Sequence, residues 1–281
     1  MTQQSAQVSE RRGEVDGVPV FWREAPAPAG SGAEGPVVYL HGVPENSDAW
    51  LPFLALTGGV APDLPGFGRS GKPPSRAYTI DEYDHFVERF LEHLGIERLS
   101  MVMHDWGAVG LGFAQRHPER IERMVLINVV PFLPGYRWHR VARVWRTPGA
   151  GELALKLTNR TTLTQGSRDT NVTPGPMPAQ WLDSVLDHLD QGTQRAIVRL
   201  YRSAPPQALA AAGSRLHSLQ MPALVAWGMA DPYIPERFGA AYAAALGRAE
   251  LLELADAGHT PWLDRPDLLE TIAAFLRAGA Q

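Results

Sequence analysis

The sequence predicts an α/β fold in which a mostly parallel sheet is flanked by helices and carries a helical insertion. Three observations support this prediction. Short apolar runs alternate with longer segments of helical period. The runs are apolar at consecutive positions, which is typical of parallel strands covered on both faces. The alternation stops after Val130 and resumes at Ala223, so one long segment interrupts it.

The individual elements follow from local patterns. Asp16-Gly17 lies between two short alternating segments, which is a signal of a β-hairpin. Apolar runs predict strands at 36–40, 59–63, 99–103, 124–128, 223–227 and 250–254. Helical periods predict helices at 79–94, 107–117, 235–246 and 266–278. Residues 1–10 are expected to be a disordered polar tail, and residues 25–35 an irregular loop.

Residues 131–215 have a different organisation from the rest of the chain. Proline and glycine clusters divide this segment into helical stretches, and it contains no strand-like run. We therefore expect a helical lid, or cap, at 131–215. The remaining residues, 11–130 and 216–281, are expected to form one core domain, which is a common size for an α/β unit.

The composition excludes several functions. The 281 residues include no cysteine, which rules out disulfides, thiolate catalysis and cysteine–zinc sites. The net charge of −4 argues against a nucleic-acid partner. Residues 1–10 lack the features of a secretory signal, and no apolar run approaches the ~18 residues needed to cross a bilayer. We expect a cytoplasmic protein with no membrane partner.

The segment from Met103 to Gly107 closes a predicted strand and opens a predicted helix. This is the context of a nucleophile elbow, and Asp105 occupies the nucleophile position. A carboxylate with a reference pKa of ~3.9 is ionised at neutral pH and needs no base to attack. Against a saturated carbon that bears a leaving group it forms an alkyl ester. The alternative is that Asp105 only caps the following helix.

Two downstream segments favour the catalytic interpretation. Asp231 follows a predicted strand, and His259 lies just before the closing helix. The order nucleophile, acid, histidine is a known chain order of a hydrolytic catalytic triad. His259 would activate water against the ester while Asp231 holds its tautomer. The backbone amides of Val43 and Trp106 would form the oxyanion hole.

These motifs together resemble the epoxide hydrolase and haloalkane dehalogenase branch of the α/β-hydrolases, over about residues 12–278. The segments that carry the resemblance are HGVPENSDAW at 41–50, DLPGFGRSGKP at 63–73, HDWG at 104–107, WGMADP at 227–232 and DAGHTPW at 256–262. The resemblance implies an α/β-hydrolase fold and an aspartate nucleophile.

The leaving group distinguishes the two activities. In the family, an epoxide oxygen receives a hydrogen bond from lid tyrosines, whereas a halide is held by indole N–H groups or an asparagine. The HGVPE segment and the lid segment containing Tyr201 resemble epoxide hydrolases, and Tyr136 is a second tyrosine candidate. We therefore expect an epoxide hydrolase that converts a small apolar or aromatic epoxide and water to a diol. The residues expected to contact substrate are His41, Pro44, Trp138, Trp145 and Trp181.

Other features keep alternatives open. Met103 stands where epoxide hydrolases usually have glycine, and no tyrosine occurs near Val144, where the first lid tyrosine would fall. Lid tryptophans could instead pair with Trp106 around a halide, as in a haloalkane dehalogenase. A fluoroacetate-type dehalogenase is disfavoured, because no arginine adjoins Trp106. A ligand-binding protein without turnover is a hypothesis from a different class, which the complete set of three catalytic residues disfavours.

No cofactor or metal is expected. Residues 66–71 match GxGxxG, but Lys72 and Pro73 follow at once, whereas a dinucleotide site needs this motif to open a helix. The nine histidines include no HExxH pattern, so we predict no metal site.

Overall fold

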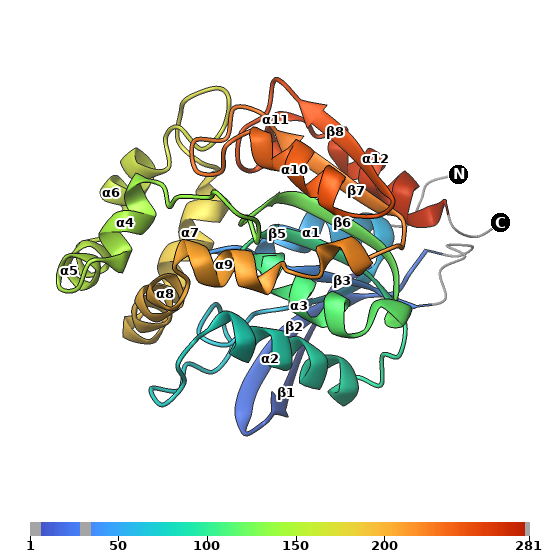
Figure 1. The fold of residues 1–281 in the computed structure, drawn as a ribbon. Coiled ribbons are helices and arrows are strands. Elements are labelled where there is room, and N and C mark those ends of the chain that lie inside the picture. Colours follow the sequence, from blue (N-terminus) through green and yellow to red (C-terminus); the bar gives the residue numbers. More distant parts are fainter. Residues whose placement is uncertain (1–6, 29–34, 279–281) are drawn as a thin grey trace.

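The computed structural model describes residues 7–28 and 35–278, and its centre is one eight-stranded sheet (Figure 1). The strands are β1 (Ser9–Val15), β2 (Val18–Ala25), β3 (Val37–Leu40), β4 (Gly59–Pro62), β5 (Leu99–Asp105), β6 (Ile121–Val129), β7 (Ala223–Gly228) and β8 (Ala249–Leu254). They lie in the order β1-β2-β4-β3-β5-β6-β7-β8. Strand β2 is antiparallel to both neighbours, and every other pairing is parallel. The predicted mostly parallel sheet is confirmed.

Helices cover both faces of the sheet because alternate residues of each strand point to opposite sides. Leu40 and Met103 belong to the apolar core on the side of α2 (Ile80–His93), α3 (Gly110–Arg116) and α10 (Arg237–Ala245). Tyr39 and Val102 belong to the core beneath α1 (Leu51–Thr57) and α12 (Leu268–Arg277). The consecutive apolar residues of the strands thus fill two separate cores. Short elements complete this part: η1 (Ser47–Trp50), η2 (Trp106–Val109), η3 (Pro118–Arg120), η4 (Leu216–Ser218) and α11 (Pro261–Asp264).

Most predicted elements are present with boundaries shifted by a few residues, and three of these shifts bear on the fold. Strand β1 begins at Ser9, so the last two residues of the expected tail pair with β2 in the hairpin. Ala25 likewise belongs to β2 rather than to the following loop. The helix expected at 107–117 starts as the 3-10 turn η2, because the chain must bend sharply after Asp105. Residues 1–6 of the expected tail and residues 29–34 of the expected loop lie outside the described residues.

The chain between β6 and β7 is helical. Residues 131–215, all of which are described, contain no strand. They form α4 (Arg140–Arg146), α5 (Ala150–Lys156), α6 (Arg160–Gly166), α7 (Ala179–His188), α8 (Gln191–Ser203) and α9 (Pro206–Ala212). We refer to residues 131–215 as the insertion. Helices α4 to α8 lie together on the left of the molecule in Figure 1.

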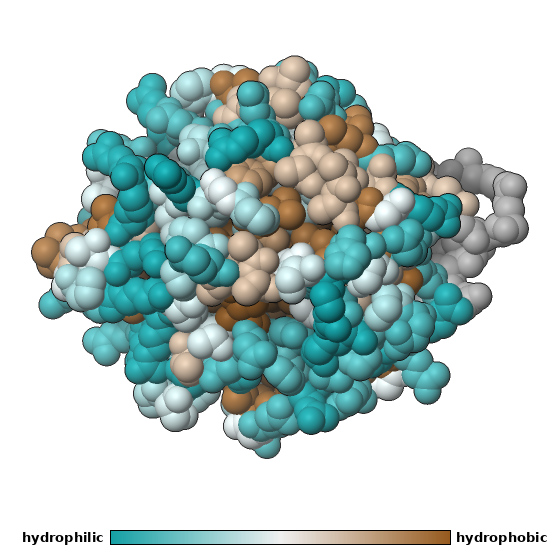
Figure 2. Space-filling view, in the orientation of Figure 1, coloured by the Kyte–Doolittle hydropathy of each residue, from teal (hydrophilic) through white to brown (hydrophobic). Residues whose placement is uncertain are grey.

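The surface is mixed in polarity. Figure 2, in the orientation of Figure 1, shows hydrophilic side chains over much of the visible face, with apolar residues in separate patches. Among the described residues, the most exposed large apolar side chains are Leu153, in the middle of α5, and Leu157, just after its end. Among the described residues, no helix is both long and apolar enough to span a bilayer.

The turn after β5 depends on a glycine. A Cβ atom on Gly107 would lie 2.1 Å from the carbonyl oxygen of Leu40, which is backbone and cannot rotate away. We predict that Gly107→Ala lowers the free energy of unfolding by about 1–3 kcal/mol, the usual cost of overpacking. Urea denaturation measures the change. The matched control is Gly166→Ala in α6, where the new methyl group meets nothing within 4 Å. Equal losses in both variants would contradict the prediction.

Candidate active site

Asp105 ends β5 in an unusual backbone conformation, with φ 47° and ψ −117°. This left-handed region is costly for a residue with a side chain, and such strain is concentrated at functional sites. Its carbonyl oxygen accepts a hydrogen bond from the Val130 amide at 2.9 Å, which ties the turn to the end of β6. The carboxylate does not cap η2. The capping alternative therefore has no support, and the turn has the geometry of a nucleophile elbow.

Two backbone amides stabilise the Asp105 carboxylate. Oδ1 accepts a hydrogen bond from the Val43 amide at 2.8 Å. The Trp106 amide also stabilises the charged form. The chain at Gly42 passes so close that a Cβ there would lie 2.6 Å from the Asp105 Cβ. The amides of Val43 and Trp106 thus both contact the Asp105 carboxylate, which is the placement expected for the predicted oxyanion hole.

His259 lies between two carboxylates. Its Nδ1 is 2.7 Å from Oδ2 of Asp231, and its Nε2 is 3.7 Å from Oδ2 of Asp105. Asp231 is fixed in turn by hydrogen bonds from the backbone amides of Tyr233 and Ile234 and from the side-chain amide of Asn128. The three residues come from the ends of β5, β7 and β8, so the parallel sheet brings them together at its carboxyl edge.

The charges in this group depend on one another. Burial would lower the pKa of His259, but the carboxylates of Asp231, Asp105 and Glu45 raise it to about 9. Burial raises the pKa of the Asp105 carboxyl, and the charge of His259 opposes that effect. For Asp231, burial is outweighed by the charge and hydrogen bond of His259, so its pKa is lowered. With a pKa of about 9, the His259 side chain is an imidazolium at neutral pH.

A second buried pair, His104 and Glu45, contacts the backbone of His259. The two ring nitrogens of His104 face the carbonyl oxygen of His259 at 2.9 Å and Oε2 of Glu45 at 3.2 Å. Oε1 of Glu45 accepts the Trp181 indole N–H at 2.8 Å. Burial would raise the pKa of Glu45, but these partners lower it to about 2. The sequence analysis quoted Glu45 only within a motif and missed this role.

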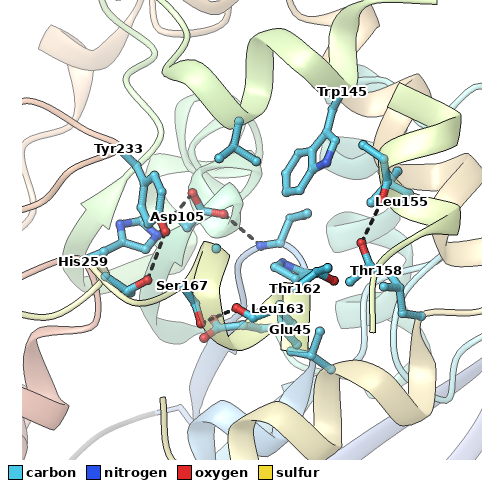
Figure 3. A pocket seen from close by; sticks show the side chains of 18 of the residues that line it. Glu45, Asp105, Trp145, Leu155, Thr158, Thr162, Leu163, Ser167, Tyr233 and His259 are labelled. Atoms are coloured by element: carbon cyan, nitrogen blue, oxygen red, sulfur yellow. Dashed lines mark hydrogen bonds and ion pairs between the residues drawn. The ribbon is translucent and has the colours of Figure 1, made fainter. Parts of the chain in front are cut away.

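A cavity of about 260 Å³ opens above Asp105, between the sheet edge and the insertion (Figure 3). The core contributes Val43, Pro44, Asp105, Tyr233 and His259 to its lining, whereas the insertion contributes mainly apolar side chains together with His139 and Tyr201. Trp145 and Trp181 line it as well. Of the expected substrate contacts, Pro44, Trp145, Trp181 and Tyr201 are therefore at the cavity wall. His139 and Tyr233 were not anticipated.

His139 is a neutral hydrogen-bond donor in this wall. Its Nδ1 accepts a hydrogen bond from the Ala142 amide at 3.4 Å and so caps α4. Burial, helped by the charge of His259, lowers the pKa of His139 to about 4. A neutral imidazole whose Nδ1 is an acceptor carries its proton on Nε2. No sequence signal distinguished His139 from the other histidines.

Three expected contacts are corrected by the structure. His41 does not line the cavity, because its ring is fully buried and its nitrogens bond to Gly42 and to the Leu64 amide. Tyr136 does not line it either, and its hydroxyl donates to the Tyr233 carbonyl at 3.4 Å. Trp138 stacks on Trp106 beneath the wall, with ring centroids 5.4 Å apart, and donates its indole N–H to Ala204. These three residues therefore lie behind the residues that line the cavity.

Nothing in the geometry indicates a metal site near Asp105. Among the described residues, the group with suitable spacing is Asp81, Asp84 and His85 on α2. Asp84 there already forms an ion pair with Arg116 at 2.6 Å.

Comparison with known proteins agrees with this architecture. A family model described as "Alpha/beta hydrolase family" matches residues 37–271. The chain is 31% identical to haloalkane dehalogenase 1 of Mycobacterium tuberculosis, with 73% of this chain and 70% of that protein covered. It is 29% identical to a cis-3-alkyl-4-alkyloxetan-2-one decarboxylase of Xanthomonas campestris, with 86% and 90% covered.

Solved structures show the same fold. The crystal structure of haloalkane dehalogenase DbeA from Bradyrhizobium elkani matches with a TM-score of 0.80, at 24% identity, over 97% of this chain and 98% of that one. The chain therefore belongs to the alpha/beta hydrolase family. Within that family it falls in the haloalkane dehalogenase and epoxide hydrolase branch, as its motifs indicated.

The arrangement of charges gives a testable pKa. Asp231→Asn removes a negative charge that stabilises the imidazolium of His259, so we predict that the pKa of His259 falls well below 9. NMR titration of ¹⁵N-labelled histidine measures this value. Glu253→Gln, at an exposed position of β8, is the matched control and leaves the value unchanged. An unchanged pKa in Asp231→Asn would mean that the 2.7 Å contact is not formed in solution.

Proposed function

We propose that the protein is an epoxide hydrolase that opens a small apolar or aromatic epoxide to a vicinal diol through an ester on Asp105. The observation that carries the proposal is the kind of donor that the insertion presents beside Asp105. Tyr201 offers a phenol and His139 an imidazole N–H to the cavity. These are donors for an oxygen that leaves as an alkoxide, since such an oxygen needs a hydrogen bond or a proton.

The electrostatics of Tyr201 suit this role. Burial, together with the negative charge of Asp105, raises the pKa of Tyr201 well above its ordinary value. The phenol therefore keeps its proton until an alkoxide, which is far more basic, develops next to it. Trp106 and Trp145 pack edge-to-face against the Tyr201 ring at 5.2 and 5.0 Å, which fixes its orientation.

In the first step, Oδ2 of Asp105 attacks one ring carbon. The carbon–oxygen bond of the epoxide breaks, and Tyr201 passes its proton to the oxygen while His139 donates a hydrogen bond. Oδ1 remains bound to the Val43 amide and becomes the ester carbonyl oxygen. The site thus divides the carboxylate into one oxygen that attacks and one that is held.

In the second step, the ester must be hydrolysed. Ester formation removes the negative charge of Asp105, which is one of the charges that raise the pKa of His259. The pKa of His259 therefore falls, and the neutral imidazole can take a proton from water. The hydroxide attacks Cγ of the ester, and the amides of Val43 and Trp106 stabilise the negative oxygen. Collapse of this intermediate breaks the ester carbon–oxygen bond, and the diol oxygen takes the proton of the new carboxyl group, which restores the Asp105 carboxylate. The proton that His259 lost when its pKa fell returns through solvent to the Tyr201 phenolate left by the first step, so the cycle closes.

A competition assay tests the proposal directly. Styrene oxide and a 1-haloalkane are offered together, and diol and free halide are measured in the same tube. We predict diol without halide, and no product from Asp105→Ala. Halide without diol would contradict the proposal. Stoichiometric ligand binding with no product of either kind would favour a ligand-binding protein.

One structural observation favours the haloalkane dehalogenase alternative, in addition to the similarity of the chain to haloalkane dehalogenases. The buried Trp106 Nε1 makes no well-formed hydrogen bond within the described part of the chain, and an indole N–H is a suitable donor to a halide. Trp106 does not line the cavity, however, whereas Tyr201 packs against it and does. The donor presented to a leaving group is therefore the phenol rather than the indole.

The two donors can be tested separately from the nucleophile. We predict that Tyr201→Phe slows ester formation from an epoxide by about a hundredfold or more, the usual contribution of acid catalysis, and that His139→Leu slows it by less. Rapid quenching followed by mass spectrometry of the protein measures this step. Tyr136→Phe is the matched control, because Tyr136 lies outside the cavity, and it should react at the wild-type rate. A larger defect in Tyr136→Phe than in Tyr201→Phe would reverse the assignment.

A further inference from the structure

One irregular segment of the insertion touches the loop that carries the catalytic base. The segment is the part of the α6–α7 connection from Ser167 to Val172. The backbone amide of His259 donates a hydrogen bond to the carbonyl oxygen of Thr170 at 2.7 Å. The approach is close, because a Cβ atom on Gly258 would lie 2.2 Å from that same oxygen. The insertion therefore contacts the backbone of the base itself as well as covering the site.

Thr170 also reaches the loop that carries the acid. Its buried side-chain hydroxyl lies 3.0 Å from the hydroxyl of Tyr233, and the two share a hydrogen bond. Tyr233 donates its backbone amide to Asp231, and its ring packs edge-to-face on the ring of His259 with centroids 5.0 Å apart. Thr170 is thus bonded to both loops that orient the imidazole.

A carboxylate fastens the same segment a second time. Oδ2 of Asp264, at the end of α11, accepts hydrogen bonds from the amide of Gly258 at 2.8 Å and from the amide of Val172 at 3.2 Å. The two amides belong to the base loop and to the insertion, so Asp264 joins them. The two segments are consequently joined twice, directly at His259 and through Asp264 at Gly258.

The nucleophile has no such dependence. Asp105 is held by the Val43 amide and by the bond from the Val130 amide to its carbonyl oxygen. Both partners belong to the core. The nucleophile is therefore held by the core alone, whereas the base that hydrolyses the ester is bonded to the insertion. The donors to the leaving oxygen, which belong to the insertion, are a separate matter.

From these contacts we infer that Thr170 is a positioning residue for His259, and that it couples the placement of the insertion to hydrolysis of the ester. The inference rests on the proposed ester mechanism. Its consequence is a division between the two steps. Loosening the Thr170 contacts should slow ester hydrolysis while ester formation on Asp105 continues.

The test compares full-length variants in rapid-quench experiments with styrene oxide, in which the ester on the protein is followed by mass. Thr170→Val removes the hydroxyl but keeps the size and the backbone carbonyl. We expect ester hydrolysis to slow about tenfold, as for loss of one buried hydrogen bond, with ester formation within about twofold of wild type. Thr170→Ser restores the hydroxyl and should restore hydrolysis. His259→Gln, which lacks the base, marks complete accumulation of ester.

Two further variants keep the inference falsifiable if Thr170→Val fails to fold. Tyr233→Phe removes the other partner of the same hydrogen bond and should reproduce the hydrolysis defect, with no added loss in the double variant. Gly258→Ala forces the segments apart and should also slow hydrolysis. Equal effects on both steps, or no effect of Thr170→Val and Tyr233→Phe on either, would overturn the inference.

A measurement without substrate separates this inference from the proposed function. In Thr170→Val, the pKa of His259 should fall from about 9, because the imidazole is held less firmly against Asp231. Thr170→Ser should keep the wild-type value. If styrene oxide forms no ester on the wild type, the proposed function fails, while the NMR titration still decides whether Thr170 positions His259. An unchanged pKa in Thr170→Val would overturn the positioning role.

Discussion

The left-handed turn at Asp105 is the constraint on which the site depends. A side chain in that conformation requires its neighbours to give way, and the chain meets this need with glycine at Gly42 and Gly107, where a Cβ would collide with Asp105 or with the Leu40 carbonyl. The turn directs the carboxylate away from the helix that follows and toward the Val43 amide and His259. Pairing of β5 with the parallel strands β3 and β6 offsets the free-energy cost of this backbone conformation.

The buried charges are stable only as a group. An isolated carboxylate or imidazolium would be expensive at this depth, and each one here has an opposite charge or several hydrogen-bond donors in contact. Asp231 accepts three hydrogen bonds besides that of His259, whereas Asp105 has fewer partners and keeps a raised pKa. Asp231 is therefore held more firmly than Asp105, as the proposed roles of orienting acid and nucleophile require. This asymmetry lets a change of charge on Asp105 alter the protonation of His259.

The fold and the three central residues could be predicted from the sequence because their signals are local. Asp105, Asp231 and His259 each follow a short apolar strand, and parallel strands bring such positions to one edge. The wall of the cavity could not be predicted in the same way. Tyr136 and His139 lie three residues apart, and only tertiary packing decides that His139 lines the cavity while Tyr136 is turned into the core. Spacing suggested a tyrosine near Val144, but the side chain that reaches the cavity from this part of the insertion is His139, the residue that caps α4.

In the proposed mechanism, the residues that act on the leaving group and those that hydrolyse the ester occupy separate segments of the chain. His139 and Tyr201 lie in the insertion, whereas Asp105, Asp231 and His259 lie in the core. Exchange of the insertion among descendants of one ancestor would therefore change the bond that is broken without rebuilding the hydrolytic apparatus. Thr170 limits that freedom, because any replacement segment has to present a carbonyl and a hydroxyl to the same two loops. In this scheme, residues of the cavity wall can change to accept new substrates, whereas the short segment that contains Thr170 is constrained by its contacts.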